Sequence, residues 1–506
     1  MHDTSDMTRS STLAALLVLF VAVAACSDDS GGGDAADTGR DFIDDADMPD
    51  VSVDVDQPDG EQLPAVAISV SAVAQNPANS LSFYVIWSTD VATPTHLEVT
   101  CGEDGEYDQT FSGAEARTDH EVFVMGLWEG ASCDLKIVAE ADGYARTTAS
   151  TTIDEAGPVP EQMPDLDVQV MELDKMQRGW TLWSVTGAIN TEFDRLVVAT
   201  DEQGRTRWYY RPGSSQQGAG DEIKLLDDNR ILLTAADPQQ IIDWEGNVLF
   251  ELDTHSHHDA QIAPWDERHL LYLGVSGENC MDTNEHTVHE MDMDSGEVVW
   301  TWRICDHYTP RVNYWNWSHL NTVEPFPDGE RAMLISSRNQ DNIFKLNRDT
   351  GEIDWVFGKD GDFAMEDDAY FFRQHAPVFL ENGDILLFDN GVQAEELRNL
   401  GDPVEWERLY SRAVQYRLHF TPDGEPDRGE VVWEYADPTL FAENRSEADR
   451  LENGNTLLHY VWVHPDIQVR MREVTMEGEV VWDVVTPPDI ASYRSERIDP
   501  HYGFVR

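Results

Sequence analysis

The sequence predicts an all-β protein in which a β-sandwich precedes a six-bladed β-propeller. A short phrase that begins with Gly and ends with Trp or Phe recurs six times, starting at residues 204, 246, 296, 351, 429 and 478. The starts lie 42, 50, 55, 78 and 49 residues apart, and short apolar segments alternate with turn residues between them. Repeats of this length with this alternation are typical of propeller blades. Ahead of the repeats, more short apolar segments separated by turns indicate the sandwich.

Each repeat over residues 168–506 is interpreted as four strands, named A to D from the channel outwards. In the fifth unit these strands are His375–Leu380, Asp384–Phe388, Ala413–Arg417 and Val431–Trp433. The recurring phrase supplies the turn before strand D and the strand itself. The first unit, 180–210, looks incomplete, so we expect residues 492–506 to add a strand there and close the ring.

Residues 63–157 are predicted to form the sandwich, which resembles a fibronectin type III or immunoglobulin-like module. Its candidate strands are Leu81–Ser88, His96–Thr100, His120–Val124 and Cys133–Val138. We see no constellation of reactive side chains in these segments. A role as spacer or support is therefore the simplest interpretation of this domain.

The N-terminus looks like a bacterial lipoprotein leader. Leu13–Ala25 is an apolar run that is too short for a stable membrane span and has the length of a signal-peptide core. It ends in Val23-Ala-Ala-Cys26, which resembles a lipobox whose Cys takes the lipid. We therefore expect residues 1–26 to be a signal with lipidation at Cys26, although an ordinary secretory signal is the alternative. Ser27 resembles the outer-membrane sorting pattern, which predicts a lipid-anchored protein of the cell envelope with no other membrane contact.

The charge of the chain is strongly acidic. It carries 97 Asp and Glu residues against 34 Lys and Arg, for a formal net charge of −63. A polyanion such as nucleic acid would be repelled, so nucleic acid is excluded as a partner. Residues 27–62 are rich in Asp, Gly and Ser with few aromatic residues, and we predict a disordered acidic linker there.

Five cysteines fit an oxidising compartment. With Cys26 taking lipid, an even number remains for disulfides. Proximity in the sequence favours the pairs Cys101–Cys133 and Cys280–Cys305.

Three histidines and one arginine are expected to meet at one mouth of the propeller channel. Strand A runs along the channel and strand B returns, so the start of each A and the end of each B share a face. His258, His319 and His375 begin strand A of the third, fourth and fifth units, and Arg338 ends strand B of the fourth. A lone His in a strand is more often structural, but three at equivalent positions indicate a site.

A zinc site is one alternative for three histidines. Arg338 cannot be a metal ligand, however, and its permanent charge favours an anion. We therefore predict no metal, and we identify no pattern typical of a cofactor-binding site.

Six segments resemble the bacterial arylsulfate sulfotransferase family across 168–506. They are His257-His-Asp259, Trp317-Ser-His-Leu-Asn321, Ser336-Ser-Arg-Asn-Gln-Asp341, Asp354-Trp-Val-Phe-Gly358, Gln374-His375 and Leu386-Leu-Phe-Asp-Asn-Gly391. The resemblance implies a periplasmic six-bladed propeller that moves a sulfuryl group from a phenolic sulfate ester to a phenolic acceptor without a nucleotide donor. It also implies a ping-pong mechanism in which a histidine carries the sulfuryl group.

By this resemblance His375 is the nucleophile, surrounded by His258, His319 and Arg338. Asn321 matches a further donor, which we assign with His257 to substrate binding. The residues suit this chemistry by themselves. Neutral imidazole is a competent nucleophile near pH 7, and a forked guanidinium fits a tetrahedral oxyanion. The other two histidines are of the type that transfers protons to and from phenols.

Two other functions stay open. The first is a non-catalytic propeller, tethered to the envelope, that binds aromatic or sulfated ligands. The second, a quinoprotein dehydrogenase, is disfavoured by the six units and by the lack of an identifiable cofactor-binding pattern. The rim aromatics at 314–317 and 370–372 either stack on an aromatic substrate or pack the loops. The sequence indicates no oligomeric state.

Overall fold

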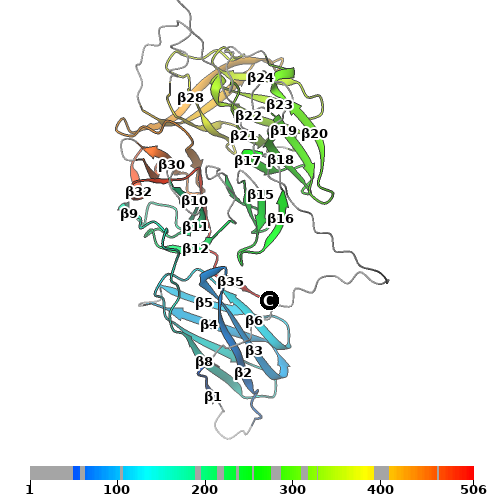
Figure 1. Cartoon of the computed structure of the whole chain (residues 1–506), viewed down its shortest axis with the longest axis vertical. Helices are drawn as coiled ribbons and strands as arrows, with labels where there is room; N and C mark the ends of the chain where they lie inside the picture. Colours follow the sequence, from blue (N-terminus) through cyan, green and yellow to red (C-terminus); the bar gives the residue numbers. More distant parts are fainter. Residues whose placement is uncertain are drawn as a thin grey trace, which may run out of the picture. The chain divides into compact units, whose positions relative to one another are not determined.

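Residues 47–506 form one compact unit, which is described here from a computed structural model (Figure 1). The structure describes residues 49–56, 63–102, 106–187, 195–212, 222–234, 239–252, 256–274, 287–308, 317–327, 329–392, 410–463 and 467–506. The predicted signal segment with Cys26, most of the predicted linker, and Cys280 lie outside these ranges.

The prediction of an all-β protein is confirmed. The described residues form β-strands, with two single-turn 3₁₀ helices at Ile304–Asp306 and Arg338–Gln340. Within these ranges, no helix has the length and apolar character needed to cross a membrane.

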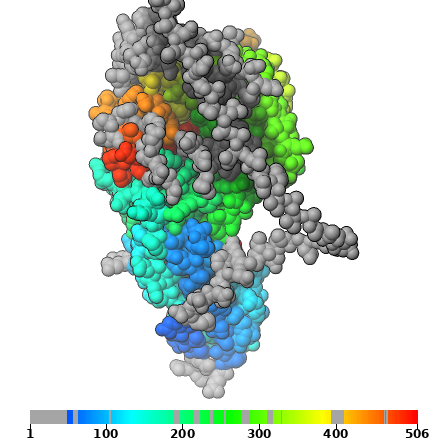
Figure 2. Space-filling model, in the orientation of Figure 1, coloured from blue at the N-terminus to red at the C-terminus, as the bar shows by residue number. Residues whose placement is uncertain are grey.

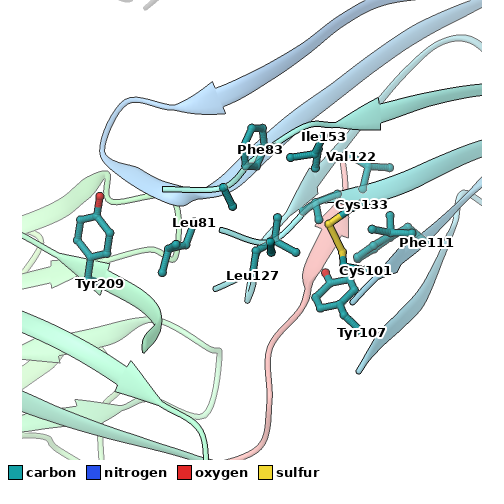
Figure 3. Packing of buried hydrophobic residues seen from close by; sticks show 14 of the residues in the cluster. Leu81, Phe83, Cys101, Tyr107, Phe111, Val122, Leu127, Cys133, Ile153 and Tyr209 are labelled. Carbon is teal, nitrogen blue, oxygen red and sulfur yellow. A yellow bond between two sulfur atoms is a disulfide. The ribbon is translucent and has the colours of Figure 1, made fainter. Parts of the chain in front are cut away.

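Two antiparallel sheets make the sandwich (Figure 1). One sheet has the order β1 (Ser52–Asp56), β8 (Arg146–Ile153), β7 (Cys133–Ala139), β4 (Thr95–Cys101) and β5 (Tyr107–Ser112). The other has the order β2 (Ile68–Asn76), β3 (Asn79–Thr93), β6 (Arg117–Val124) and β35 (Gly503–Val505). Apolar side chains fill the core, and the predicted Cys101–Cys133 disulfide joins β4 to β7 (Figure 3).

Strand β1 corrects the prediction that residues 27–62 are disordered throughout. Ser52–Asp56 pairs with β8 along its whole length. All five residues are exposed, so this strand gains little from burial. It forms because the edge of β8 offers backbone hydrogen-bonding groups to an extended segment with alternating valines. Composition alone therefore misjudged this part of the predicted linker.

The C-terminus of the chain belongs to the sandwich, which the sequence did not predict. Residues 503–505 pair with Val122–Val124 of β6 (Figure 1). Gly503 has a φ of +120°, and a Cβ there would lie 1.9 Å from the carbonyl oxygen of Phe123. The close approach of the two backbones therefore requires glycine at this position.

Six further antiparallel sheets follow one another along the described chain, as expected for six blades. The first sheet contains β10 (Trp180–Gly187), β11 (Leu196–Thr200) and β12 (Thr206–Tyr210) with β33 (Ile490–Ala491) and β34 (Ser495–Ile498). The second contains β13 (Ile223–Leu225), β14 (Ile231–Leu233), β15 (Gln239–Ile242) and β16 (Val248–Leu252). The third contains β17 (Ser256–Ile262), β18 (His269–Gly274), β19 (Thr287–Asp292) and β20 (Glu297–Arg303). The fourth sheet contains β21 (Leu320–Pro325), β22 (Ala332–Ser337), β23 (Asn342–Asn347) and β24 (Ile353–Gly358). The fifth contains β25 (His375–Phe379), β26 (Ile385–Asp389), β27 (Arg412–Phe420) and β28 (Pro426–Ala436). The sixth contains β29 (Glu447–Arg450), β30 (Thr456–Val463), β31 (Gln468–Val474) and β32 (Val480–Val485).

The expected closure of the first blade is present. Strand β34 pairs with β10 as the inner strand of that blade, and β33 pairs with the other end of β10. The segment that closes the blade is thus 490–498, whereas the last residues continue into the sandwich. Strand β9 (Asp167–Met171) pairs with β32 at the outer edge of the sixth blade, and the teal and red surfaces meet there (Figures 1 and 2).

Polar contacts link the inner end of each blade to the next around the axis. They are Glu496 to Leu225, Lys224 to Asp259, Asp259 to Val323, Asn321 to Gln374, His375 to Arg445, and Glu447 to Ser495. The sheets therefore form a complete ring.

The recurring phrase occupies the outer strands, as predicted. Gly204 shows the usual geometry, with a φ of +79° in the turn that leads into β12. The fifth blade differs. Gly424 takes the turn position with a φ of +86°, and Gly429 lies inside β28. A Cβ on Gly429 would lie 2.3 Å from the Phe357 ring, so this glycine permits close packing between neighbouring blades.

Candidate active site

Unusual backbone conformations mark one end of four inner strands. His258, His319, Ala376 and Arg445 have φ values of +61°, +45°, +48° and +54°, near the starts of β17, β21, β25 and β29. The pairing of the first three of these strands with their neighbours is interrupted at the same places. Positive φ is uncommon outside glycine, and such strain clusters at functional sites. The repetition at equivalent blade positions identifies this mouth of the channel as the candidate site.

The three predicted histidines are brought together around one tyrosine. The rings of His258 and His319 are 4.8 Å apart between centroids. The ring of Tyr493 lies 5.9 Å from His258 and 6.5 Å from His375, edge to face in both cases. Tyr493 comes from the segment between β33 and β34 that closes the first blade. Sequence reasoning missed it, because only the ring closure places this segment beside strands from other blades.

The hydrogen bonds of His375 fix its tautomer. Its Nδ1 lies 2.7 Å from Oδ1 of Asn390 and 3.1 Å from the carbonyl oxygen of Arg373. Both partners accept, so Nδ1 carries the hydrogen and donates it. The backbone N–H of Arg445 donates to Nε2 at 3.3 Å. In the neutral ring the lone pair is therefore on Nε2.

His375 stays uncharged at neutral pH. Its side chain is buried, and burial disfavours the imidazolium. This burial, together with the nearby positive charge of Arg338, holds the pKa of His375 well below its ordinary value. A neutral imidazole with a defined lone pair has the properties of a nucleophile.

Arg338 is anchored beside His375. It follows β22 directly and begins the second 3₁₀ helix. Its Nη1 donates to Oδ1 of Asn339 at 3.0 Å, and its Nη2 lies 3.5 Å from the carbonyl oxygen of Glu443. The second contact joins the fourth blade to the segment between the fifth and sixth blades. The two contacts hold a permanent positive charge at the site.

Asn321 has a structural contact in addition to the substrate role predicted for it. It is fully buried, and its amide nitrogen donates to the carbonyl oxygen of Gln374 at 2.8 Å. This bond ties the fourth blade to the residue before the candidate nucleophile. The structure therefore places Asn321 as a support for the backbone at His375.

His257 lies behind His258, away from the ring cluster. The Nδ1 atoms of the two rings are 2.7 Å apart, and Nε2 of His257 donates to the carbonyl oxygen of Gly274 at 3.2 Å. Contacts with His319 and Tyr493 are made by His258. His258 is thus the member of the pair that belongs to the cluster.

Arg494 is a second residue near the site that sequence reasoning did not identify. Its guanidinium is buried on the channel axis, where it donates to the carbonyl oxygen of Asn321 and to the hydroxyl of Thr322, both at 3.1 Å. It also forms ion pairs with Glu222 and Asp259. Its neighbour Tyr493 is in the histidine cluster, so Arg494 anchors the segment that carries this ring.

A cavity of about 590 Å³ occupies the channel on the side of the A–B turns. Burial raises the pKa of Glu324 and of Glu496 to about 7, and that of Asp449 to about 8. These acids are therefore partly protonated at neutral pH, which lowers the negative charge within the channel.

Two of the predicted rim aromatics, Trp317 and Phe371, have packing roles. Trp317 is fully buried and stacks on Tyr308 with 6.2 Å between ring centroids. Phe371 is buried in the core between the fourth and fifth blades. Tyr314 and Trp315 lie outside the described residues. Cys305 is disulfide-bonded, and its predicted partner Cys280 also lies outside them.

Within the described ranges, no group of three or more His, Cys, Asp or Glu side chains is placed to hold a metal ion. The site contains a neutral imidazole, a fixed guanidinium and two more imidazoles. This combination can bind an anion and transfer protons.

Comparison with known proteins assigns the family. No curated protein matches the chain. A solved structure titled "Crystal structure of the eukaryotic initiation factor" matches 80% of this chain and 98% of its own at 7% identity, with a TM-score of 0.26, which is too low to support an inference. The family model described as Arylsulfotransferase (ASST) matches residues 165–485. The chain therefore belongs to the arylsulfotransferase family and is a sulfotransferase enzyme.

Proposed function

We propose that this enzyme transfers a sulfuryl group from a phenolic sulfate ester to a phenolic acceptor in two steps, through a sulfohistidine at Nε2 of His375. The observation that carries the proposal is the tautomer of His375. Asn390 and the Arg373 carbonyl hold the hydrogen on Nδ1, which leaves the Nε2 lone pair for attack.

In the first step, Nε2 attacks the sulfur of the aryl sulfate in line with the ester oxygen. The S–N bond forms as the S–O bond to the phenol breaks, and the bonding electrons leave with the phenolate. By analogy with phosphoryl transfer, the transition state is loose, with negative charge on the three peripheral oxygens. A proton from His258 or His319 then neutralises the phenolate.

Two groups are placed to stabilise the transferring sulfuryl group. Arg338 is close enough to His375 to lower its pKa, and its charge can pair with the sulfuryl oxygens. The N–H of Arg445 donates to Nε2 in the free enzyme. Once Nε2 is bonded to sulfur, this donor is released to a sulfuryl oxygen, as in an oxyanion hole.

In the second step the acceptor phenol loses its proton to a histidine, and its oxygen attacks sulfur. The S–N bond breaks, and the lone pair returns to Nε2 of His375. The free enzyme is restored without a cofactor.

Release of p-nitrophenol from p-nitrophenyl sulfate, with and without added phenol, tests this function. We expect phenol to accelerate release, and we expect His375→Ala to reduce turnover by about 10³-fold or more. His419→Ala, at a partly exposed position on β27, is the matched control and should behave as wild type. Release that does not depend on phenol would contradict the transfer reaction.

We also propose that the enzyme is anchored to the envelope through lipid on Cys26, because residues 13–26 resemble a lipoprotein leader. Detergent phase separation tests this anchor. The full-length protein expressed in a bacterium should partition into the detergent phase, whereas Cys26→Ser should remain in the aqueous phase. Equal partitioning of the two proteins would refute the anchor.

A further inference from the structure

A pair of adjacent imidazoles lies in the wall of the site. His257 and His258 are perpendicular to each other, and their Nδ1 atoms are 2.7 Å apart. One hydrogen must lie between these two nitrogens, because two lone pairs at this distance would repel. The position of that hydrogen determines which ring is the donor.

The carbonyl oxygen of Gly274 fixes the outer end of the pair. A carbonyl can only accept, so Nε2 of His257 carries a hydrogen. When His257 is neutral, its Nδ1 must accept. His258 then donates from its own Nδ1, and its lone pair is on Nε2, which lies on the other side of the ring from His257. His258 is thus held as a base.

The anchor itself is rigid. The Gly274 carbonyl also accepts a hydrogen bond from the hydroxyl of Thr287 at 2.5 Å. A Cβ on Gly274 would lie 2.5 Å from the ring of His289, so packing on both sides fixes this carbonyl. The pair therefore connects the histidine cluster to a fixed acceptor at the end of β18, where Gly274 pairs with Thr287 of β19.

We propose that His257 and His258 form a two-imidazole proton relay for the phenols, an inference that rests on the proposed function. As the acceptor oxygen attacks sulfur, its O–H bond breaks and Nε2 of His258 takes the proton. The Nδ1 hydrogen of His258 moves to Nδ1 of His257. His258 ends neutral with hydrogen on Nε2, and His257 ends as the imidazolium. In the first half-reaction the relay runs the other way. The free enzyme begins with His257 as the imidazolium, Nε2 of His258 gives its hydrogen to the departing phenolate, and the Nδ1 hydrogen of His257 moves to Nδ1 of His258. The pair is then neutral in the sulfuryl enzyme, where it can take the proton of the acceptor.

The surroundings explain why the charge would be passed on. Among the described residues, the groups close to the pair include His319 from the start of β21, Tyr493 from the closing segment, and His289 from β19. A proton kept on His258 would remain in the cluster that also holds the charge of Arg338. On His257, the same charge is one ring farther from the cluster, and the imidazolium donates its Nε2 hydrogen to the Gly274 carbonyl. His257 is therefore a relay and positioning residue, which differs from the substrate contact predicted for it.

Two donors with different leaving groups test the relay. The p-nitrophenolate ion departs readily without a proton, whereas the phenolate from phenyl sulfate requires one. His257→Asn retains an acceptor for Nδ1–H of His258, so it preserves the tautomer but cannot take the proton. His257→Phe removes both functions. His419→Asn removes a partly exposed imidazole on β27, in another blade, and is the matched control.

With His257→Asn we expect a wild-type burst of p-nitrophenol but a burst of phenol slowed by about 10²-fold, the low end of acid–base catalysis. His257→Phe should slow both bursts, and His419→Asn neither. Equal effects of His257→Asn on the two donors, or no effect on either, would overturn the relay. A search for the sulfuryl adduct in wild type and in His257→Asn separates failure of the relay from failure of the proposed function. An adduct without donor selectivity refutes the relay alone, and no adduct in wild type refutes the proposed function.

Discussion

The amide oxygen of Asn390 lies 2.7 Å from Nδ1 of His375, and this contact determines which nitrogen of the histidine carries the lone pair. The amide nitrogen of Asn390 donates to the carbonyl oxygens of Ala442 and Arg445. One buried side chain thus orients the proposed nucleophile and the backbone segment whose N–H faces Nε2.

Replacing Asn390 by alanine should slow formation of the sulfuryl adduct. Loss of one hydrogen bond that fixes the tautomer corresponds to about 1 kcal/mol, or roughly fivefold in the burst rate. Stopped-flow release of p-nitrophenol measures that rate, and thermal denaturation confirms that the variant is folded. Asn382→Ala, in an exposed turn of the same blade, is the control. An unchanged burst in Asn390→Ala would show that the contact does not orient the nucleophile.

The first step should be insensitive to mild acid. The pKa of His375 is held well below that of an ordinary histidine, so its lone pair persists as the pH falls through about 6.5. The burst rate with p-nitrophenyl sulfate should therefore be flat from about pH 8 to pH 5.5. A decline centred near pH 6.5 would mean that the nucleophile titrates as an exposed histidine does.

Arg338→Met should impair the enzyme in two ways. It removes the positive charge that pairs with the sulfuryl oxygens, which should lower kcat/KM by about 10²–10³-fold. It also removes a cause of the low pKa of His375, so the burst rate should begin to decline at a higher pH than in wild type. Arg331→Met, on the same blade but exposed, should leave both quantities unchanged. Wild-type kinetics in Arg338→Met would exclude this arginine from the site.

Asp449 should destabilise the protein at alkaline pH. Burial and the charge of Glu496 raise its pKa to about 8, so the folded protein holds a proton that the unfolded chain releases near pH 4. Stability therefore falls as the pH rises between these two values. Asp449→Asn should raise the free energy of unfolding by about 1–3 kcal/mol at pH 9 and have no effect at pH 3.5. Denaturant unfolding at both pH values tests this, with exposed Asp423→Asn as the control. A gain of the same size at both pH values would contradict the assignment.

The sequence was sufficient to predict the blades and the position of the histidines. The recurring phrase defines the phase of each blade, and that phase places His258, His319 and His375 at equivalent strand starts. The left-handed backbone at His258 and His319 could not be predicted in this way, because it depends on how the strands enter the ring.

The contributions of the C-terminal segment also depend on the complete fold. Tyr493 and Arg494 reach the channel only because β34 closes the first blade, and Gly503 pairs with a strand formed far earlier in the chain. No local pattern marks these residues. The motif that ends in Gly391 did contain Asn390, but its hydrogen bond to His375 was not evident from spacing.

The role of His375 is tested most directly by mass spectrometry of the enzyme after rapid mixing with an aryl sulfate in the absence of acceptor. We expect a sulfuryl adduct on His375 that disappears when phenol is added. His375→Ala should give no adduct. An adduct on a different residue, or turnover without any adduct, would contradict the proposal that His375 carries the sulfuryl group.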